Sequence, residues 1–358
     1  MTISAKFEIE YLQYLDPEGK SAAKLPKIAA DRDAMLSMYR MMSTVRVFDR
    51  KAIALQRTGQ LGTYASCLGH EATHVAIGAA MKPEDAFFPM YREYGAQFMR
   101  GVKMEQVLLF WGGDERGNDF SGPKHDFPWC VPIATQCHNA TGAAMAFKYR
   151  KEPRVAVSVI GDGGTSQGDF YESLNAAGAW NLPAVFVVAN NKWAISVPLE
   201  LQTSCETLAQ KAIAGGFRGV QVDGNDIIAM RAAMDDALEQ ARTGGGPTLI
   251  EAMTYRLSDH TTADDARRYR KQEEVQEAEL KEPLIRIRKW LMDKKWWSQK
   301  DEDALLETAA AQVDEAVQTY LASGKPPVES MFDHLFADMP QSLADQREIA
   351  IAEAKHHG

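Results

Sequence analysis

Two buried-type strands separated by one helix constrain the fold of this chain more than any other feature. The strand-like runs span residues 155–160 and 184–189, and apolar side chains recur at helical spacing between them, over 168–180. Short apolar runs rich in β-branched residues are typical of strands that are buried on both faces. A helix between two such strands forms the crossover of a parallel pair. The sequence therefore predicts a βαβ unit.

Further segments extend this pattern in both directions. Apolar runs predict additional strands at 86–90, 220–222 and 248–253. Helical spacing predicts helices at 32–58, 95–101, 104–111, 139–150 and 226–241, and a helical pattern from 272 through 322.

Together these elements predict an α/β fold with a mainly parallel sheet, helices on both faces and a helical C-terminal region. We expect three parts in the chain. Residues 1–30 form an N-terminal extension, 31–270 an α/β domain and 271–358 the helical C-terminal region.

Composition narrows the classes of partner. The net charge of -9 gives no general reason to expect nucleic acid, so an anionic ligand requires a local site. No apolar run reaches membrane-spanning length, and the polar start of the chain lacks the features of a secretory signal. We therefore expect a cytoplasmic protein that does not bind membranes. The four cysteines are scattered, which predicts reduced thiols.

The residues that follow the two strands of the βαβ unit predict a phosphate and metal site. Gly161-Asp-Gly-Gly follows the first strand, and Asn190-Asn191 follows the second. In parallel sheets, ligands bind where the carboxyl ends of the strands meet, and helices that begin there direct free N–H groups at anions. Asp162 and Asn191 provide the oxygen ligands that Mg²⁺ prefers, and the carbonyl of Trp193 is a candidate for a third.

The segment after the first strand does not match two other phosphate-binding motifs. A dinucleotide fingerprint from Gly161 requires glycine where Ser166 stands, and a Walker loop requires lysine where Asp169 stands, so both fail. Each half of the site taken alone is compatible with an ordinary turn or loop. The glycines flanking Asp162 allow the backbone to approach a diphosphate, and we expect Thr165 or Ser166 to cap the following helix.

These residues give the chain a resemblance to alpha subunits of 2-oxo acid dehydrogenases. Gly161-Asp-Gly with Asn190-Asn191 is similar to the thiamine diphosphate motif, and Gly168-Asp-Phe-Tyr-Glu-Ser-Leu-Asn-Ala-Ala-Gly resembles the version in that family. The likeness covers about residues 48–269, with weaker matches on both sides. Pyruvate and branched-chain types both fit.

The resemblance implies a role for each matching residue. It implies that thiamine diphosphate is bound by Tyr91, Arg92, Val131, Ile133, Asp162, Gly163, Gly164, Asn191 and His260. It implies that Mg²⁺ is bound by Asp162, Asn191 and the carbonyl of Trp193. Within these sets, Ile133 props the cofactor into its bent form, and His260 is the catalytic histidine that reaches the diphosphate from a mobile loop. Taken singly, Ile133 is interpreted as a core residue and His260 as a surface residue.

Several positions depart from the family pattern, including the Ser258-Asp259 pair before His260, which differs from the more common glycine-containing versions. Trp193 stands where the family has tyrosine, which matters little if only its carbonyl binds metal. Thr261 stands where mitochondrial relatives have a phosphorylated serine, and we do not infer kinase control from it.

The resemblance also implies partners and a reaction. It implies an α2β2 heterotetramer in which a beta subunit supplies the glutamate that activates the cofactor, so this chain is inactive alone. A 2-oxo acid is decarboxylated, and its acyl group passes to a lipoyl group on the acyltransferase core of a multienzyme complex. Pyruvate is the first choice of substrate. A branched-chain 2-oxo acid or acetoin dehydrogenase is the alternative.

Another interpretation comes from His70-Glu71-Ala-Thr-His74, which matches the zinc-protease pattern of two histidines one helical turn apart. A zinc hydrolase requires a third ligand, and no Gly-x-x-His extension follows His74. The segment also coincides with a helix expected in the dehydrogenase family, where these histidines are not required. We therefore favour the dehydrogenase.

Two further alternatives belong to non-enzyme classes. Six basic residues and three tryptophans alternate over 286–300, as on some nucleic-acid or membrane surfaces. We favour an amphipathic helix with its tryptophans packed inside and its cations in water. A scaffold subunit that keeps the fold without turnover is disfavoured, because Asp162, Asn191, Arg92 and His260 are all retained.

Overall fold

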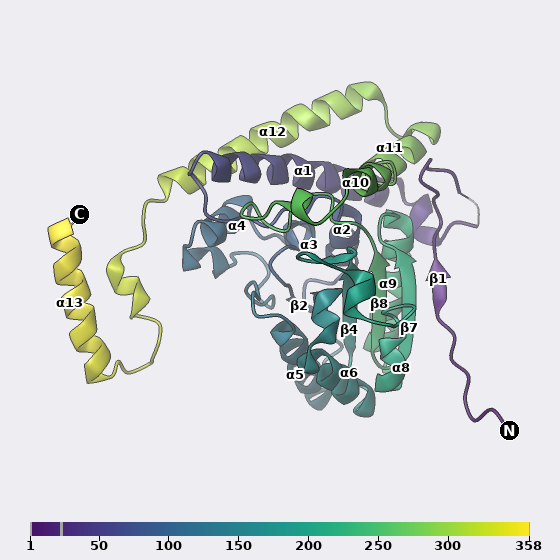
Figure 1. Ribbon diagram of the computed structural model, residues 1–358, viewed down its shortest axis with the longest axis horizontal. Coiled ribbons are helices and arrows are strands. Elements are labelled where there is room, and N and C mark those ends of the chain that lie inside the picture. The colour runs from purple at the N-terminus through teal and green to yellow at the C-terminus, as the bar shows by residue number, and fades with distance from the viewer. Residues whose placement is uncertain (1, 22–23, 358) are drawn as a thin grey trace.

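The predicted βαβ unit forms the middle of a six-stranded parallel sheet (Figure 1). The computed structural model describes residues 2–21 and 24–357. The strands lie in the order β1-β7-β8-β4-β3-β2, and every neighbouring pair is parallel. Their bounds are β1 Glu10–Leu12, β2 Ala86–Phe88, β3 Ala156–Gly161, β4 Ala184–Asn190, β7 Arg218–Asp223 and β8 Thr248–Met253. A separate small hairpin consists of β5 Trp193–Ala194 and β6 Val197–Pro198.

Helices account for most of the remaining regular structure. The α-helices are α1 Arg32–Arg57, α2 Glu71–Ala80, α3 Tyr94–Arg100, α4 Met104–Trp111, α5 Thr135–Arg150, α6 Gly168–Ala179, α7 Leu199–Gln202, α8 Lys211–Gly215, α9 Ile227–Arg242, α10 Gln272–Glu279, α11 Pro283–Asp293, α12 Gln299–Ala322 and α13 Gln341–His357. The 3-10 helices are η1 Lys27–Ala30, η2 Glu115–Asn118, η3 Gly163–Ser166, η4 Ala266–Arg268 and η5 Val328–Met331.

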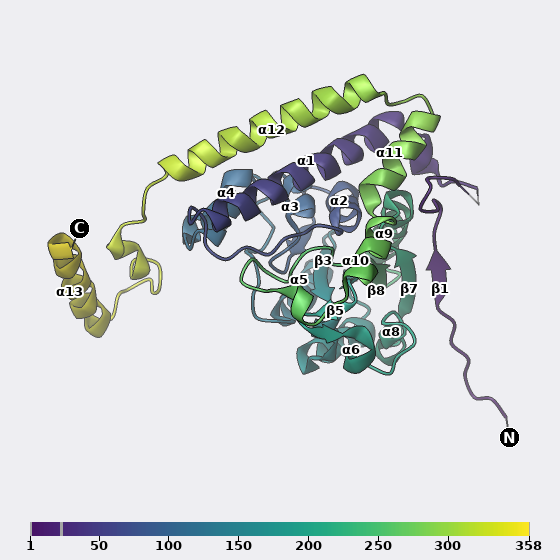
Figure 2. The ribbon, with the colours of Figure 1, turned by 45° about the horizontal axis from the view of Figure 1, so that its top comes forward.

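Both faces of the sheet are covered by helices, as predicted. On one face α5 packs against β2, β3 and β4, with α6 beside it and α8 next to α6. On the other face α9 packs against β4, β7 and β8, and α2 packs on α9. An outer layer follows, in which α12 lies along α1 (Figure 2). This arrangement buries the strands on both sides and leaves the carboxyl edge of the sheet for the site.

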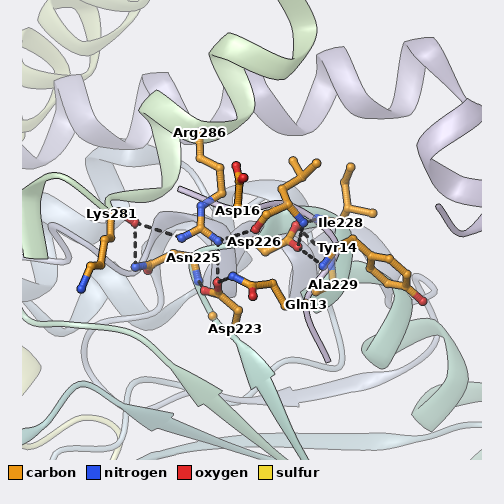
Figure 3. A network of polar contacts seen from close by, with 12 residues as sticks. Gln13, Tyr14, Asp16, Asp223, Asn225, Asp226, Ile228, Ala229, Lys281 and Arg286 are labelled. Carbon is orange, nitrogen blue, oxygen red and sulfur yellow. Dashed lines mark hydrogen bonds and ion pairs between the residues drawn. The ribbon is translucent and has the colours of Figure 1, made fainter. Parts of the chain in front are cut away.

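The predicted N-terminal extension contributes a strand to the sheet. β1 pairs in parallel with β7, and polar contacts anchor the chain just beyond it (Figure 3). Asp226 accepts hydrogen bonds from the backbone N–H groups of Tyr14 and Leu15, both at 2.6 Å. Arg286 of α11 forms a buried ion pair of 2.5 Å with Asp223 and donates to the carbonyl of Leu15 at 3.0 Å. These contacts join the N-terminal segment and α11 to the loop between β7 and α9.

The segment 286–300 is only partly what the sequence predicts. Trp290 and Trp297 are buried, which confirms the predicted inward packing for these two, while Trp296 is only partly buried against the same core. The prediction that the cations face water is wrong for Arg286, because Asp223 supplies a carboxylate that pairs with its buried guanidinium. The segment is also two helices, since α11 ends at Asp293 and α12 begins at Gln299.

The remaining differences are small. The helix predicted from residue 139 begins four residues earlier, at Thr135, directly after Ala134 in the left-handed conformation. All four cysteines are free, as expected. No helix in the described part of the chain has both the length and the apolar character needed to span a bilayer. The C-terminal helix α13 stands away from the main body (Figure 1).

Candidate functional site

The residues that the sequence assigns to the site line a single pocket at the carboxyl edge of the sheet. Its volume is about 470 Å³, a size typical of small-molecule sites. The lining includes every predicted cofactor and metal residue: Tyr91, Arg92, Val131, Ile133, Asp162, Gly163, Gly164, Asn191, Trp193 and His260. The parallel sheet thus brings together residues that are far apart in the sequence.

The turn after β3 differs from the expected strand-to-helix junction. Gly163–Ser166 form the short helix η3, and α6 begins after Gln167, which makes no side-chain cap. The prediction that Thr165 or Ser166 caps α6 is therefore wrong. Thr165 instead donates its hydroxyl back to the carbonyl of Asp162 at 2.7 Å, because the chain makes this extra turn before the helix starts.

A buried lysine supports the same turn from outside the pocket. Lys211, the first residue of α8, donates to both the carbonyl and the hydroxyl oxygen of Thr165, each at 2.9 Å. Its ammonium also lies 5.1 Å from the ring centre of Tyr171, at cation–π distance. Lys211 therefore ties α8 to the loop that carries Asp162.

The two glycines after Asp162 are required by packing as well as by ligand access. A Cβ atom on Gly163 would lie 2.4 Å from the Cβ of Ala194, and one on Gly164 would lie 2.6 Å from the side chain of Ile160. Both distances are shorter than any ordinary contact between carbon atoms. Any larger residue at either position would therefore displace the β5 hairpin or the end of β3.

Asp162 is buried and held by a side chain that the sequence did not reveal. Gln202, the last residue of α7, donates to Asp162 Oδ2 at 2.8 Å. Burial raises the pKa of the Asp162 carboxyl, while the amide of Gln202 and the backbone N–H of Asn191 favour its charged form. The carboxylate is thus oriented and next to Asn191, and a bound cation would stabilise its ionised state.

Both the oxygen and the nitrogen of the Asn191 side-chain amide lie at hydrogen-bond distance from a partner. Its Oδ1 accepts the backbone N–H of Trp193 at 3.1 Å, and its Nδ2 lies 3.1 Å from Nε2 of His70. Burial lowers the pKa of His70 to about 3, and the charges of Arg92 and Arg256 act in the same direction. His70 is therefore neutral near pH 7, which allows Nε2 to accept a hydrogen bond.

The neighbouring Asn190 has a different role. Its Nδ2 donates to Oε1 of Glu251 on β8 at 2.7 Å, and its backbone carbonyl accepts the N–H of Thr254 at 2.9 Å. The side chain of Asn190 thus joins β4 to β8 below the pocket. Of the two asparagines, only Asn191 lines the pocket.

The carbonyl of Trp193 lies in a strained turn. Lys192 and Ile195 have φ angles of 74° and 56°, a region that is unfavourable for a β-branched residue such as Ile195. Arg256 donates to the carbonyls of Trp193 at 3.2 Å and of Ile195 at 2.7 Å. This buried guanidinium therefore holds the backbone that presents the third candidate metal ligand.

Arg92 and His260 meet in the same pocket. Arg92 is buried and donates to the carbonyl of Ser66 and, at 2.9 Å, to the carbonyl of His260. Its Nη2 also lies 3.4 Å from Nδ1 of His260, whose ring contacts Tyr91 edge-on at 6.1 Å. Burial lowers the pKa of His260 to about 4, with the charges of Arg92 and Arg256 acting in the same direction. The pocket therefore combines a fixed cation with a neutral imidazole.

Two apolar side chains project into the pocket from the segment before α5. Val131 is 53% exposed and Ile133 is 39% exposed, so neither is a core residue. An interpretation of Ile133 as core, which its residue type alone favours, is thus wrong. Exposed apolar residues that line a pocket are available to contact the apolar part of a ligand.

The zinc-protease pattern is not assembled into a zinc site. Glu71 forms a buried ion pair of 2.8 Å with Arg46 and accepts the N–H of Gly69, so it does not face a metal-bound water. Within the described residues, neither His70 nor His74 belongs to a group of three or more His, Cys, Asp or Glu residues spaced to bind an ion. The short motif here is part of a packed helix.

Four supporting residues were missed from the sequence: His70 as a partner of Asn191, Gln202, Lys211 and Arg256. Each acts through a contact with a residue tens of positions or more away in the sequence, and no local sequence pattern predicts such a contact. The signal that existed was the leftover His70 of the zinc-protease pattern. His70 lies at the start of α2, and the site predicted from the sequence gave it no role.

Comparisons with known proteins show a family and several close relatives in sequence. The family model described as "Dehydrogenase E1 component" matches residues 39–329. The chain is similar to the pyruvate dehydrogenase E1 component subunit alpha of Acholeplasma laidlawii (41% identity over 92% of this chain and 94% of the relative). It is also similar to the protein of that name in Staphylococcus aureus (42% identity over 96% and 93%). The 3-methyl-2-oxobutanoate dehydrogenase subunit alpha of Mycobacterium tuberculosis is 40% identical over 97% and 95%.

Proposed function

Because the chain belongs to the dehydrogenase E1 component family, we propose that it is the alpha subunit of a 2-oxo acid dehydrogenase acting on pyruvate. The enzyme class predicted from the sequence is confirmed by the family match and by the names of the relatives. The observation that carries the proposal is the single pocket lined by all ten predicted cofactor and metal residues.

Thiamine diphosphate is the cofactor that this family implies, and the pocket has suitable groups for it. When bound, it stabilises the negative charge left on the substrate carbon by loss of carbon dioxide. Arg92 would bind the diphosphate with its guanidinium, and Gly163 and Gly164 would present backbone without side chains. Val131 and Ile133 would contact the apolar part, with Ile133 supporting the bent form.

The metal proposed for the same pocket is Mg²⁺. Asp162, Asn191 and the carbonyl of Trp193 offer three oxygen donors of different chemistry, and diphosphate oxygens complete such a coordination shell in other proteins. Each of the three already has a hydrogen-bond partner from a separate part of the chain: Gln202, His70 and Arg256 respectively. Such outer contacts orient metal ligands and raise metal affinity.

His260 is the proposed catalytic histidine of this chain. Its neutral imidazole lies between Tyr91 and Arg92, so it is placed to contact the diphosphate and to close the pocket. The loop that carries it is anchored by Asp264, which accepts the backbone N–H of His260 at 2.9 Å. We propose that this loop limits solvent access to the reacting groups during turnover.

The first proposed partner is a beta subunit. We propose that this subunit supplies the glutamate that activates the cofactor, in an α2β2 heterotetramer, and the name "subunit alpha" of the relatives supports this. We propose that the acyl group passes from there to a lipoyl group on an acyltransferase core, in a cytoplasmic multienzyme complex. The subunit name of the relatives supports membership of a complex.

Cofactor binding tests the proposal directly. In tetramer reconstituted with the beta subunit, Asp162→Ala and Asn191→Ala are expected to abolish Mg²⁺-dependent binding of thiamine diphosphate in isothermal titration calorimetry. Asp169→Ala is the matched control, because this carboxylate lies in the same segment but is half exposed and outside the pocket lining. Unchanged affinity in both site variants overturns the site.

A second substrate class is supported by one comparison. The mycobacterial relative named for 3-methyl-2-oxobutanoate is nearly as similar to this chain as the relatives named for pyruvate. Turnover of pyruvate, branched-chain 2-oxo acids and acetoin by the reconstituted tetramer decides between them. A kcat/KM for pyruvate at least about tenfold above the others, a difference of roughly 1.4 kcal/mol in transition-state binding, supports pyruvate.

A further inference from the structure

The amide of Asn191 is held between two groups that together determine which way it faces. The backbone N–H of Trp193 is a fixed donor, and it lies 3.1 Å from Oδ1 of Asn191. If the amide were turned over, its NH₂ group would face this donor and the hydrogen bond would be lost. Nδ2 therefore faces the other way, where Nε2 of His70 lies at 3.1 Å.

We propose that His70 is a positioning residue for the metal site, which accepts the Nδ2–H of Asn191 so that Oδ1 stays directed at the metal. This inference rests on the proposed role of Asn191 as a metal ligand. The hydrogen bond requires the tautomer with its proton on Nδ1, since Nδ2 of Asn191 can only donate. An acceptor at this point is what distinguishes His70 from a residue that only fills space.

The position of His70 is well determined by its surroundings. The residue is 1% exposed and stands at the start of α2, where its carbonyl accepts the N–H of His74 at 3.0 Å. The two imidazole rings stack with centres 5.5 Å apart and planes 23° apart. The preceding Gly69 is fixed through its carbonyl by the Thr254 hydroxyl at 2.6 Å. Little freedom remains for the ring, so the acceptor is preorganised.

Loss of this acceptor has a predictable cost. Asn191 is buried, so a free Nδ2 would lack a partner, and rotation of the side chain to find one would move Oδ1 away from the metal. Outer contacts of this kind typically change metal affinity about 10- to 100-fold when removed. The first histidine of the zinc-protease pattern is thus used to orient an asparagine that binds Mg²⁺.

Metal affinity of the reconstituted tetramer tests the proposal. Mn²⁺ is titrated in the presence of thiamine diphosphate, and the free ion is measured by electron paramagnetic resonance. We expect His70→Leu, which keeps the bulk but has no acceptor, to raise the Kd for Mn²⁺ about tenfold. His70→Gln, whose Oε1 can accept the same hydrogen bond, should return the Kd to within about threefold of the unmodified protein.

His74→Phe, which keeps a ring stacked on His70, is the matched control. His74 is equally buried and lies one helical turn later, but its ring nitrogens form no hydrogen bond with a described residue, so this variant should keep the original Kd. An unchanged Kd in His70→Leu overturns the inference, as does an equal loss in His74→Phe or a failure of His70→Gln to recover. Absence of Mn²⁺ binding by the unmodified tetramer instead overturns the proposed metal site itself.

Discussion

The guanidinium of Arg256 spans the carbonyl oxygens of Trp193 and Ile195, with donor distances of 3.2 and 2.7 Å. Its Nη2 also contacts the hydroxyl of Tyr269 at 2.8 Å, from the segment that follows the His260 loop. One buried arginine thus connects the turn that carries a proposed metal ligand with the region that carries the proposed catalytic histidine. A planar fork of donors is needed for this geometry.

Arg256→Lys is therefore expected to be damaging despite keeping the charge. A single ammonium cannot span both carbonyls, so the turn around Ile195, which is unfavourable in isolation, loses its restraint. We expect a loss of roughly 2 to 3 kcal/mol in the free energy of unfolding and weaker Mn²⁺ binding. Arg268→Lys, at an exposed position of the same region, is the control and should change neither quantity. Equal behaviour of the two variants contradicts this role.

His260→Ala is expected to leave the tetramer intact and to impair catalysis. The imidazole contacts Arg92 and Tyr91 in the pocket and contributes little to the core, so assembly measured by analytical ultracentrifugation should not change. The rate of reductive acylation of a lipoyl domain should fall about 100-fold or more, as is usual on removal of a group that contacts the reacting cofactor. His138→Ala, at an exposed histidine of α5, is the control. Unimpaired acylation by the His260 variant would show that the loop has no role in the reaction.

Glu93 should make stability depend on pH. It is buried with neither carboxylate oxygen bonded to a described residue, and burial raises its pKa to about 7. This pKa exceeds the ordinary value of 4.5. The stability that the folded protein has with Glu93 protonated is therefore fully present below pH 4.5 and is lost as pH rises through 7. Glu93→Gln, which remains neutral, should thus be more stable than the unmodified protein at pH 8 by roughly 3 kcal/mol.

The advantage of Glu93→Gln should disappear as the pH falls toward 5, and thermal unfolding at both pH values measures it. The exposed Glu84→Gln is the control and should behave like the unmodified protein at both. A Glu93 variant that is less stable at pH 8 means that the carboxylate is ionised and paired in the folded state.

The buried pair of Arg286 and Asp223 is expected to behave as a unit. Arg286→Met leaves the Asp223 carboxylate and the carbonyl of Leu15 without their common donor (Figure 3), so unfolding by urea should show a loss of about 3 to 5 kcal/mol. Adding Asp223→Asn to this variant should recover part of the loss, because no unpaired charge then remains. Strict additivity of the two substitutions would show that the pair is not coupled.

Local patterns were sufficient where the deciding interactions are local in sequence. The strands at 155–160 and 184–189 and the helix between them occur where periodicity places them, because burial on both faces requires apolar runs of that length. The rule that parallel strands share a carboxyl edge then brought Asp162 and Asn191 into one pocket. These patterns did not predict which residue forms a hydrogen bond with each site residue.

The capping of α6 shows where local reasoning failed. Thr165 and Ser166 are good capping residues, yet the turn of η3 precedes the helix and Thr165 bonds to Asp162 and Lys211. In the same way, Arg286 was expected in water, and only the proximity of Asp223 in the fold makes its burial favourable.

The sequence by itself determined the fold class, the family and the residues that line the pocket, because buried strands and short motifs are recognised from residues close together in the sequence. Tertiary structure alone decided how those residues are held: His70 against Asn191, Gln202 against Asp162 and Arg256 against Trp193. The physical reason is that hydrogen bonds depend on distance and direction in space. Sequence spacing specifies these only within one element or one motif, so the contacts that orient the proposed ligands became visible only in the folded chain.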